Sequence, residues 1–221
     1  MKCNGIIYRE GLMSRIFIFL SCFIATTSLF AGKGLDRLMK GNDRYVHDLL
    51  EHPNRTSERR ESLVSSQAPF AAIVGCSDSR VPPEIIFDQG VGDLFVVRVA
   101  GNVIGPIELS SVEYAVRNLG ASVILVMGHK NCGAVKAVVE GQVSKIEPIA
   151  EIIEPAIKEV EVDHPKDLLN ACIKTNAVRM KQILLKSPVV QKLIAEGKLE
   201  VSAAYYNLET GAVELLDPKK F

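Results

Sequence analysis

The stretch VILVMGHKNCG, residues 123–133, is the most informative about the fold, because a run of apolar residues leads without a break into a histidine and a cysteine. The same arrangement stands upstream in FAAIVGCSDSR, residues 70–80, where the apolar run ends at Cys76. Between them lies LFVVRV, residues 94–99, which only Arg98 interrupts. Continuous apolarity is typical of a strand whose two faces are both covered. The three runs therefore predict three strands of one sheet.

Helical segments alternate with these strands. Residues 107–119 place Val112, Ala115 and Val116 on one helical face, and residues 133–140 follow the third strand. This alternation predicts an α/β fold, with a mostly parallel central β-sheet flanked by helices. An added C-terminal strand or hairpin is also expected. The later elements are predicted as helices at 148–160, 167–185 and 188–196, and strands at 199–206 and 213–216.

The segment before the first strand is predicted to be helical. Apolar residues recur at helical spacing over residues 35–50, with Gly41 as a weak point. Residues 57–66 read as a polar helical connector, with Ser57 as its N-cap. No stretch after residue 34 has the composition of a linker, so residues 32–221 are predicted to form one domain.

The N-terminus has a different character and is predicted to be a signal peptide over residues 1–31. Residues 16–30 carry no charge, Arg15 precedes them, and the small residue Ala31 follows. An uncleaved membrane anchor is the alternative, although the run is shorter than the ~20 residues of a comfortable span. We expect a periplasmic or secreted protein with no stable membrane span in its mature form. The sequence leaves open whether Met1 or Met13 is the true start.

Composition excludes some classes of partner and of fold. The chain has 221 residues, and its 26 basic residues equal its 26 acidic residues. Such a balance gives no electrostatic reason to expect a nucleic-acid partner. Cys3 and Cys22 fall in the predicted signal peptide, and three cysteines remain. An odd number at irregular spacing argues against a disulfide framework.

Two of the predicted strands end in potential metal ligands, namely Cys76 after the first and His129 and Cys132 after the third. If these strands are parallel neighbours, the three side chains emerge at one edge of the sheet. Two thiolates and one imidazole leave a tetrahedral Zn2+ with a vacant position, which is typical of a catalytic site. Taken singly, Cys76 is more often a core residue, and His-x-x-Cys is a weak signal.

Asp78 and Arg80 stand beside Cys76 at this strand end. Ionisable residues at a buried position are costly unless they pair, so a carboxylate held by a guanidinium is expected here. An ordinary surface salt bridge remains the alternative.

Cys-Ser-Asp-Ser-Arg at 76–80 and Gly-His-x-x-Cys-Gly at 128–133 resemble the two signature motifs of the β-carbonic anhydrases. Residues 92–98 and 112–116 are similar to that family too, and the resemblance covers about 35 to 216. It implies reversible hydration of carbon dioxide to bicarbonate and a proton, by attack of zinc-bound hydroxide. The zinc ligands would be Cys76, His129 and Cys132.

The resemblance also implies roles around the metal. Asp78 would accept a hydrogen bond from the hydroxide or, in a closed form, ligate the metal, and Arg80 would hold Asp78 away. Gln67 would bind bicarbonate, and Phe95 and Tyr114 would form pocket walls, largely in the neighbouring subunit's site. Core packing is the alternative for both aromatics. A homodimer or homotetramer is implied, with the N-terminal helices packed on a partner subunit.

One position differs from part of the family. Members with an inhibitory bicarbonate site carry a Trp three residues before the first Cys ligand, where this chain has Ile73. Arg98 and Tyr206 match two other residues of that site. Without the Trp, we expect the open, constitutively active arrangement.

Other functions stay open on sequence alone. The same fold can hydrolyse a CO2-like molecule such as carbonyl sulfide or carbon disulfide, and a non-catalytic zinc-binding homologue is a further alternative. A redox thiol enzyme fits least, because Cys76 and Cys132 do not form a Cys-x-x-Cys pair.

Overall fold

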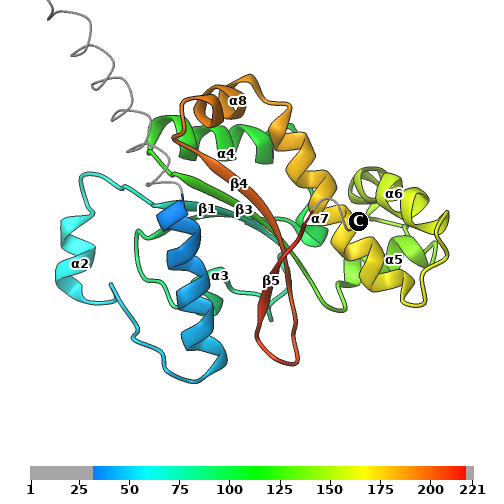
Figure 1. Ribbon diagram of the computed structural model, residues 1–221, viewed down its shortest axis with the longest axis horizontal. Coiled ribbons are helices and arrows are strands. Elements are labelled where there is room, and N and C mark those ends of the chain that lie inside the picture. Colours follow the sequence, from blue (N-terminus) through cyan, green and yellow to red (C-terminus); the bar gives the residue numbers. More distant parts are fainter. Residues whose placement is uncertain (1–31, 218–221) are drawn as a thin grey trace, which may run out of the picture.

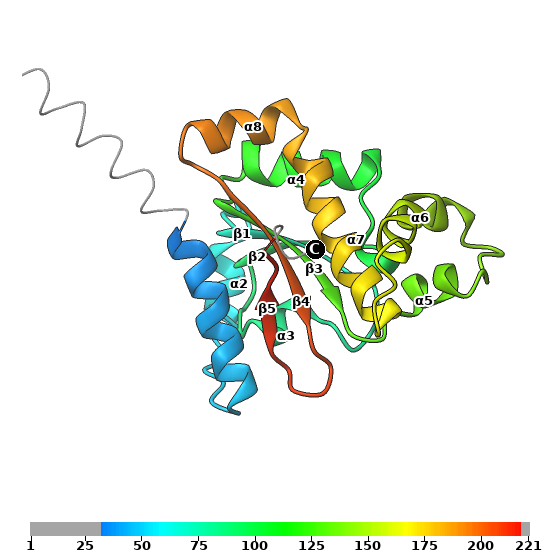
Figure 2. The same ribbon diagram turned by 45° about the vertical axis from the view of Figure 1, so that its right-hand side comes forward.

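The computed structural model describes residues 32–217, so the predicted signal peptide lies outside the described residues. Figure 1 shows one central sheet with helices on both faces. The sheet has five strands in the order β2-β1-β3-β4-β5, and all neighbours are parallel except β4 and β5. The predicted fold class is confirmed, and Figure 2 shows the C-terminal hairpin. The strands are β1 (Ala71–Gly75), β2 (Leu94–Arg98), β3 (Val123–His129), β4 (Glu200–Tyr206) and β5 (Val213–Leu215).

The predicted helices are present, with ends that differ by a residue or two in the second half of the chain. In chain order they are α4 (Pro106–Asn118), α5 (Gly133–Val139), α6 (Glu147–Glu161), α7 (Leu168–Leu185) and α8 (Pro188–Ala195). The short α3 (Pro83–Ile86) and the 3-10 turn η1 (Ala100–Asn102) were not predicted. The connector helix α2 is shorter than predicted, Ser57–Ser62, and the predicted cap is wrong. Thr56 caps it instead, because its Oγ1 accepts the N–H of Arg59 at 3.2 Å.

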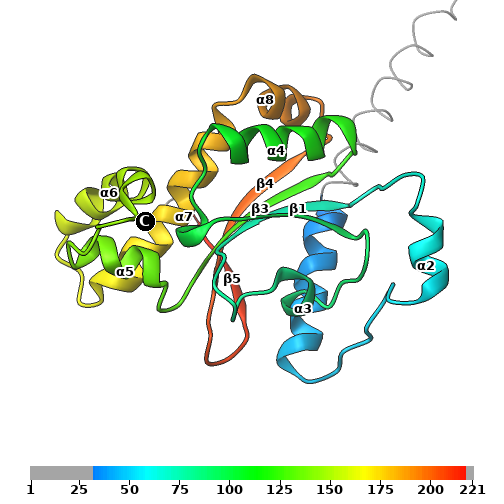
Figure 3. The same cartoon turned by 180° about the vertical axis from the view of Figure 1, so that it is seen from behind.

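Alternate residues of the strands supply two separate cores, one on each face of the sheet. Val74, Ile124 and Val126 face a core that α4 to α8 complete. Ile73, Leu125 and Met127 face a second core that the N-terminal helix and α3 complete. Figures 1 and 3 show these two helical layers from opposite sides. This explains the continuous apolar runs, since both faces of β1 and β3 are fully buried.

The N-terminal helix covers residues 32–46 of the described chain, and the prediction that it extends to residue 50 is wrong. Asp48 adopts a left-handed backbone with φ 56°, which ends the helix before Leu49. Gly41, the expected weak point of this helix, instead allows close contact between the helix and the backbone at Phe87. A Cβ there would lie 1.8 Å from the carbonyl oxygen of Phe87, so only glycine allows this approach.

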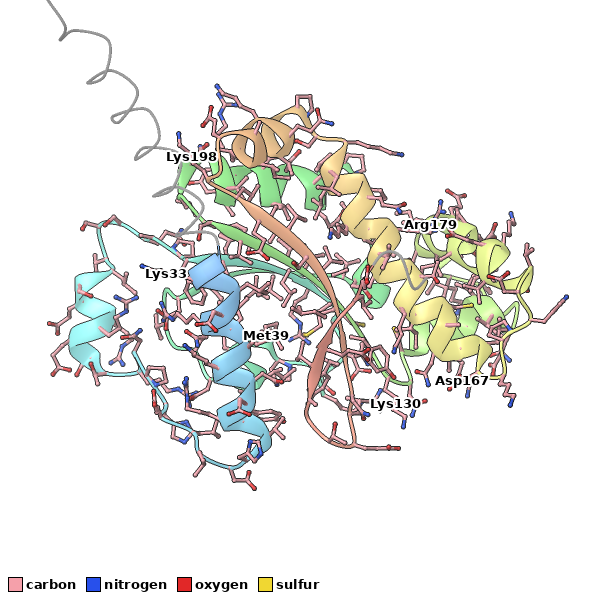
Figure 4. The ribbon with its side chains drawn as sticks, in the orientation of Figure 1. Lys33, Met39, Lys130, Asp167, Arg179 and Lys198 are labelled. Atoms are coloured by element: carbon pink, nitrogen blue, oxygen red, sulfur yellow. The ribbon has the colours of Figure 1, made fainter. Side chains whose placement is uncertain are left out.

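Within the single chain, the N-terminal helix packs on its own subunit. Leu38 is fully buried, and Figure 4 labels Met39, which packs against the same core. The Asn42 side chain accepts the N–H of Val213 at 2.8 Å and donates to the carbonyl of Gly211 at 2.8 Å. The helix is thereby tied to the C-terminal hairpin of the same chain. Packing of this helix on a partner stays a prediction.

A buried carboxylate anchors the segment that follows this helix. Asp88 is fully buried, and its Oδ2 accepts from Arg44 Nε at 2.7 Å. The N–H groups of Glu51 and His52 also donate to it, each at 3.0 Å. Burial alone would raise the pKa of Asp88, but these donors outweigh it and hold the pKa below its usual value.

We expect Asp88→Asn to lower the free energy of unfolding by about 3 kcal/mol, because it leaves the Arg44 guanidinium without its buried partner. Because the pKa of Asp88 is depressed in the folded protein, its ionisation stabilises the fold above the unfolded-state pKa of about 4. This contribution is lost as the pH falls through the folded-state pKa of Asp88. Urea unfolding from pH 7 to pH 3 measures both effects. Asp36→Asn is the control, because Asp36 pairs with Lys40 on an exposed face. Equal stability of the Asp88 and Asp36 variants would contradict the prediction.

Candidate metal centre

The topology brings three sequence-predicted ligands to one edge of the sheet. Cys76 follows the last residue of β1, His129 ends β3, and Cys132 is the N-cap residue of α5. The strands β1 and β3 are parallel neighbours, with Gly75 opposite Met127. Their carboxyl ends therefore meet, as the sequence predicts.

The distances among the three side chains fit a zinc ion. The sulfurs of Cys76 and Cys132 lie 3.9 Å apart, and each of the three residues offers a ligand atom within 4.8 Å of the others. Two sulfurs at the usual Zn–S distance of about 2.3 Å in a tetrahedron lie about 3.8 Å apart. A disulfide, by contrast, needs about 2.05 Å. The spacing is thus that of two ligands around one metal.

His129 is prepared to bind through one nitrogen. Its ring is fully buried, and Nδ1 lies 2.9 Å from the carbonyl oxygen of Lys130. A carbonyl only accepts, so Nδ1 carries the proton, and the lone pair is on Nε2. Nε2 is buried and has no hydrogen-bond partner among the described residues. Such an orphaned atom is costly unless a metal takes its lone pair.

The thiols of Cys76 and Cys132 interact directly through their sulfurs. A hydrogen bond between their sulfurs lowers the pKa of Cys76 to about 4 and raises the pKa of Cys132, because the pair shares one proton. Backbone N–H groups of Asp78 and Gly101 also donate to the sulfur of Cys76, at 3.4 and 3.3 Å. Deprotonated Cys76 is therefore stabilised, as a metal thiolate requires.

Asp78 and Arg80 form a two-pronged ion pair beside the ligands. Arg80 Nε donates to Asp78 Oδ1 at 2.9 Å, and Nη2 donates to Oδ2 at 2.7 Å. These bonds, with the N–H of Arg80 on Oδ1, hold the pKa of Asp78 well below its usual range. Oδ2 also lies 3.9 Å from Nε2 of His129. An ionised carboxylate that only accepts hydrogen bonds thus stands next to the ligand set.

Arg98 has a contact that sequence reasoning missed. Its guanidinium donates to the carbonyl of Cys76 at 2.9 Å and to the carbonyl of Asp78 at 2.6 Å. The arginine of the edge strand therefore holds the loop that carries both residues. Tyr206, the other residue matched to an inhibitory site, is buried with its hydroxyl 3.3 Å from that of Tyr45.

The three predicted substrate residues lie away from this subunit's own ligands. Gln67 is exposed before β1, at the amino edge of the sheet, opposite the metal edge. Phe95 pairs with Ala72, well before the carboxyl end of β1. Its ring contacts that of Tyr114, with centroids 6.3 Å apart, in a shallow groove on the side of β2 and α4. Their predicted roles depend on a second subunit, and they stay predictions.

A ligand set of two thiolates and one imidazole, at the carboxyl edge of a parallel sheet, defines a catalytic zinc protein. Residues 71–213 match the family model for carbonic anhydrase. The carbonic anhydrase of Mycolicibacterium smegmatis is 38% identical over 195 residues, which cover 80% of this chain and 89% of that protein. The solved β-carbonic anhydrase CcaA has a TM-score of 0.68 at 27% identity, covering 84% of this chain and 96% of that one. The chain therefore belongs to the carbonic anhydrase family, in its β class.

Other relatives agree with this assignment. Carbonic anhydrase 2 of Mycobacterium tuberculosis is 36% identical over 187 residues, covering 81% of this chain and 90% of that protein. A structure described as one of two tetrameric β-carbonic anhydrases from Sordaria macrospora has a TM-score of 0.67 at 26% identity, covering 71% of this chain and 85% of that one.

Proposed function

We propose that this site performs the reversible hydration of carbon dioxide to bicarbonate and a proton. The observation that carries the proposal is the ligand set Cys76, His129 and Cys132 with the Asp78–Arg80 pair beside it. Zinc held by these three residues would lower the pKa of a bound water to about 7 and so would supply hydroxide near neutral pH.

The chain's own residues orient the reaction. Because Asp78 stays ionised, it accepts a hydrogen bond and thereby turns the lone pair of the attacking oxygen toward carbon dioxide. Arg80 engages both carboxylate oxygens, so Asp78 is held back from becoming a fourth ligand. Arg98 fixes the backbone from which Asp78 projects. This pairing supports the open arrangement, which is also expected because Ile73 stands in place of the Trp.

The choice of substrate is tested by assaying two substrates on one preparation. Stopped-flow hydration of carbon dioxide is measured beside release of hydrogen sulfide from carbonyl sulfide. We expect rapid hydration and, at most, slow sulfide release. Sulfide release without hydration would assign the site to hydrolysis of a CO2-like molecule, and bound zinc with neither reaction would assign it to a non-catalytic homologue.

We propose further that the working form is a homo-oligomer with β2 and α4 at an interface. The edge strand β2 is only half-buried along its length, and the neighbouring Ile107 and Tyr114 are 78% and 48% exposed. Large apolar side chains gathered at such an exposed edge favour association. Similarity to the tetrameric enzymes of Sordaria macrospora supports a dimer or tetramer. In that form Gln67, Phe95 and Tyr114 reach the partner's pocket.

We expect Ile107→Glu to dissociate the oligomer and to lower CO2 hydration about tenfold or more, because a charge would be buried in the interface. Sedimentation velocity and stopped-flow assays on the same sample measure both effects. Val162→Glu is a matched control, because Val162, the C-cap residue of α6, is 77% exposed. A wild-type protein that is monomeric and fully active would contradict the interface and the role of Gln67.

We also propose export of the protein, with residues 1–31 removed. The support is the uncharged run at residues 16–30 with Arg15 before it and Ala31 after it. Within residues 32–217, none of the helices is both long and apolar enough to span a bilayer. Intact mass and N-terminal sequencing of the protein from its native compartment test the proposal. A chain that begins at Gly32 is expected, and an intact chain in the cytoplasm would contradict export.

A further inference from the structure

A backbone N–H group from outside the ligand motifs reaches the metal centre. The N–H of Gly101 donates to the sulfur of Cys76 at 3.3 Å, from the 3-10 turn that follows β2. Gly101 has φ 72° and the next residue, Asn102, has φ 47°. Glycine and asparagine both adopt this left-handed conformation readily, so the turn itself is not strained. The direction of the Gly101 N–H therefore depends on the contacts that hold the turn.

Asn176 of α7 contacts the backbone of the same residue, Gly101. Its Nδ2 donates to the carbonyl oxygen of Gly101 at 2.9 Å. The side chain is fully buried, and its Oδ1 has no hydrogen-bond partner among the described residues. A half-satisfied amide in a core is a net cost to stability, so packing alone does not account for it. Its one side-chain hydrogen bond goes to the residue that donates to Cys76.

We propose that Asn176 is a positioning residue of the metal centre, which acts through the backbone of Gly101 on the Cys76 thiolate. The N–H and the carbonyl of Gly101 belong to successive peptide groups joined at its Cα, so by fixing the carbonyl Asn176 limits the backbone rotation of this glycine and thereby keeps its N–H directed at the sulfur. A hydrogen bond to a buried thiolate compensates part of its charge and fixes the direction of the sulfur, so its loss weakens the metal site. The inference rests on the zinc site and not on the choice of substrate.

The other donors to the two sulfurs do not need such help. The N–H of Asp78 lies two residues after Cys76 in the same loop. Cys132 is the N-cap residue of α5, so the N–H groups of Ala134 and Val135 come from the helical turn that directly follows it. Gly101, by contrast, is 25 residues away from Cys76 along the chain. Its orientation depends on tertiary contacts, and Asn176 supplies one from 75 residues further on.

Asn176→Leu tests the proposal, since leucine has a similar volume and no donor. Loss of an outer-shell partner typically lowers metal affinity about 10- to 100-fold, and we expect a loss in this range, measured by competition with a chelator. In the cobalt-substituted full chain, the thiolate-to-cobalt charge-transfer band should shift, which a purely structural role would not cause. Thr175→Val, at the neighbouring buried position of α7, should change neither value.

Two further measurements guard against a folding defect. A serine side chain at position 176 is too short to reach Gly101 and does not overpack the core. If Asn176→Leu fails to fold, Asn176→Ser should therefore show the loss of metal affinity and the band shift expected of the leucine variant. In the wild-type protein loaded with cadmium-113, the Gly101 amide proton should show coupling to the metal across the N–H···S bond. A folded Asn176 variant with wild-type affinity and spectrum, or a wild-type protein without that coupling, would overturn the proposal.

Discussion

Cys132→Ser is expected to abolish zinc binding and CO2 hydration together. The serine hydroxyl does not ionise at neutral pH and is a harder ligand than a thiolate, so the site keeps only Cys76 and His129. Even outer-shell changes cost about 10- to 100-fold in affinity or activity, so loss of a direct ligand should cost more than about 100-fold. Zinc content by mass spectrometry and stopped-flow hydration, both on the purified full chain, measure the effect.

Cys172→Ser is the matched control for this variant. Cys172 is a fully buried thiol on α7 whose pKa burial raises to about 11, and it is not among the three clustered ligands. The same chemical change there should leave about one zinc per chain and wild-type hydration. If Cys132→Ser retained stoichiometric zinc and activity while Cys172→Ser lost them, the assignment of the ligands would be wrong.

Asp78→Ala is expected to separate activity from metal binding. The three ligands remain, so zinc content should stay at one per chain. Hydration should fall about 100-fold or more, because the group that orients the attacking oxygen is gone and Arg80 is left without its partner. Initial rates of CO2 hydration and zinc analysis on the same sample measure the two quantities.

Ser79→Ala controls for disturbance of the loop, because Ser79 is exposed and lies between the two members of the ion pair. We expect this variant to retain both zinc and activity. Full hydration by Asp78→Ala would remove Asp78 from the mechanism, whereas loss of zinc in that variant would make Asp78 a ligand, as in a closed site.

The strands and the metal ligands could be predicted because their signals are local. An apolar run that ends in Gly75-Cys76, and another that ends in Gly128-His129, identifies both the strand and the residue at its carboxyl end. Parallel pairing then brings these ends together without any further information. The helices of the second half of the chain were also predicted, since each combines an apolar face with a clear end.

Features that depend on contacts between distant segments could not be predicted. The N-terminal helix ends at residue 46, where Asp48 adopts a left-handed conformation and the following amides turn to bind Asp88. No local sequence pattern predicts this interaction of the backbone with Asp88. The contact of Asn176 with Gly101 is similar, because the two residues are 75 positions apart. The Gly-Asn pair at 101–102 does suggest a left-handed turn, but not what the turn touches.

The most direct test of the account is the zinc dependence of CO2 hydration by the full chain. Stopped-flow rates are measured on one preparation as purified, after removal of metal with a chelator, and after return of one equivalent of zinc. We predict that activity disappears with the metal and returns at one zinc per chain in the wild type, but not in Cys132→Ser. Hydration that survives metal removal, or a wild-type chain reloaded with zinc that does not hydrate carbon dioxide between about pH 7 and pH 9, would contradict the central claim.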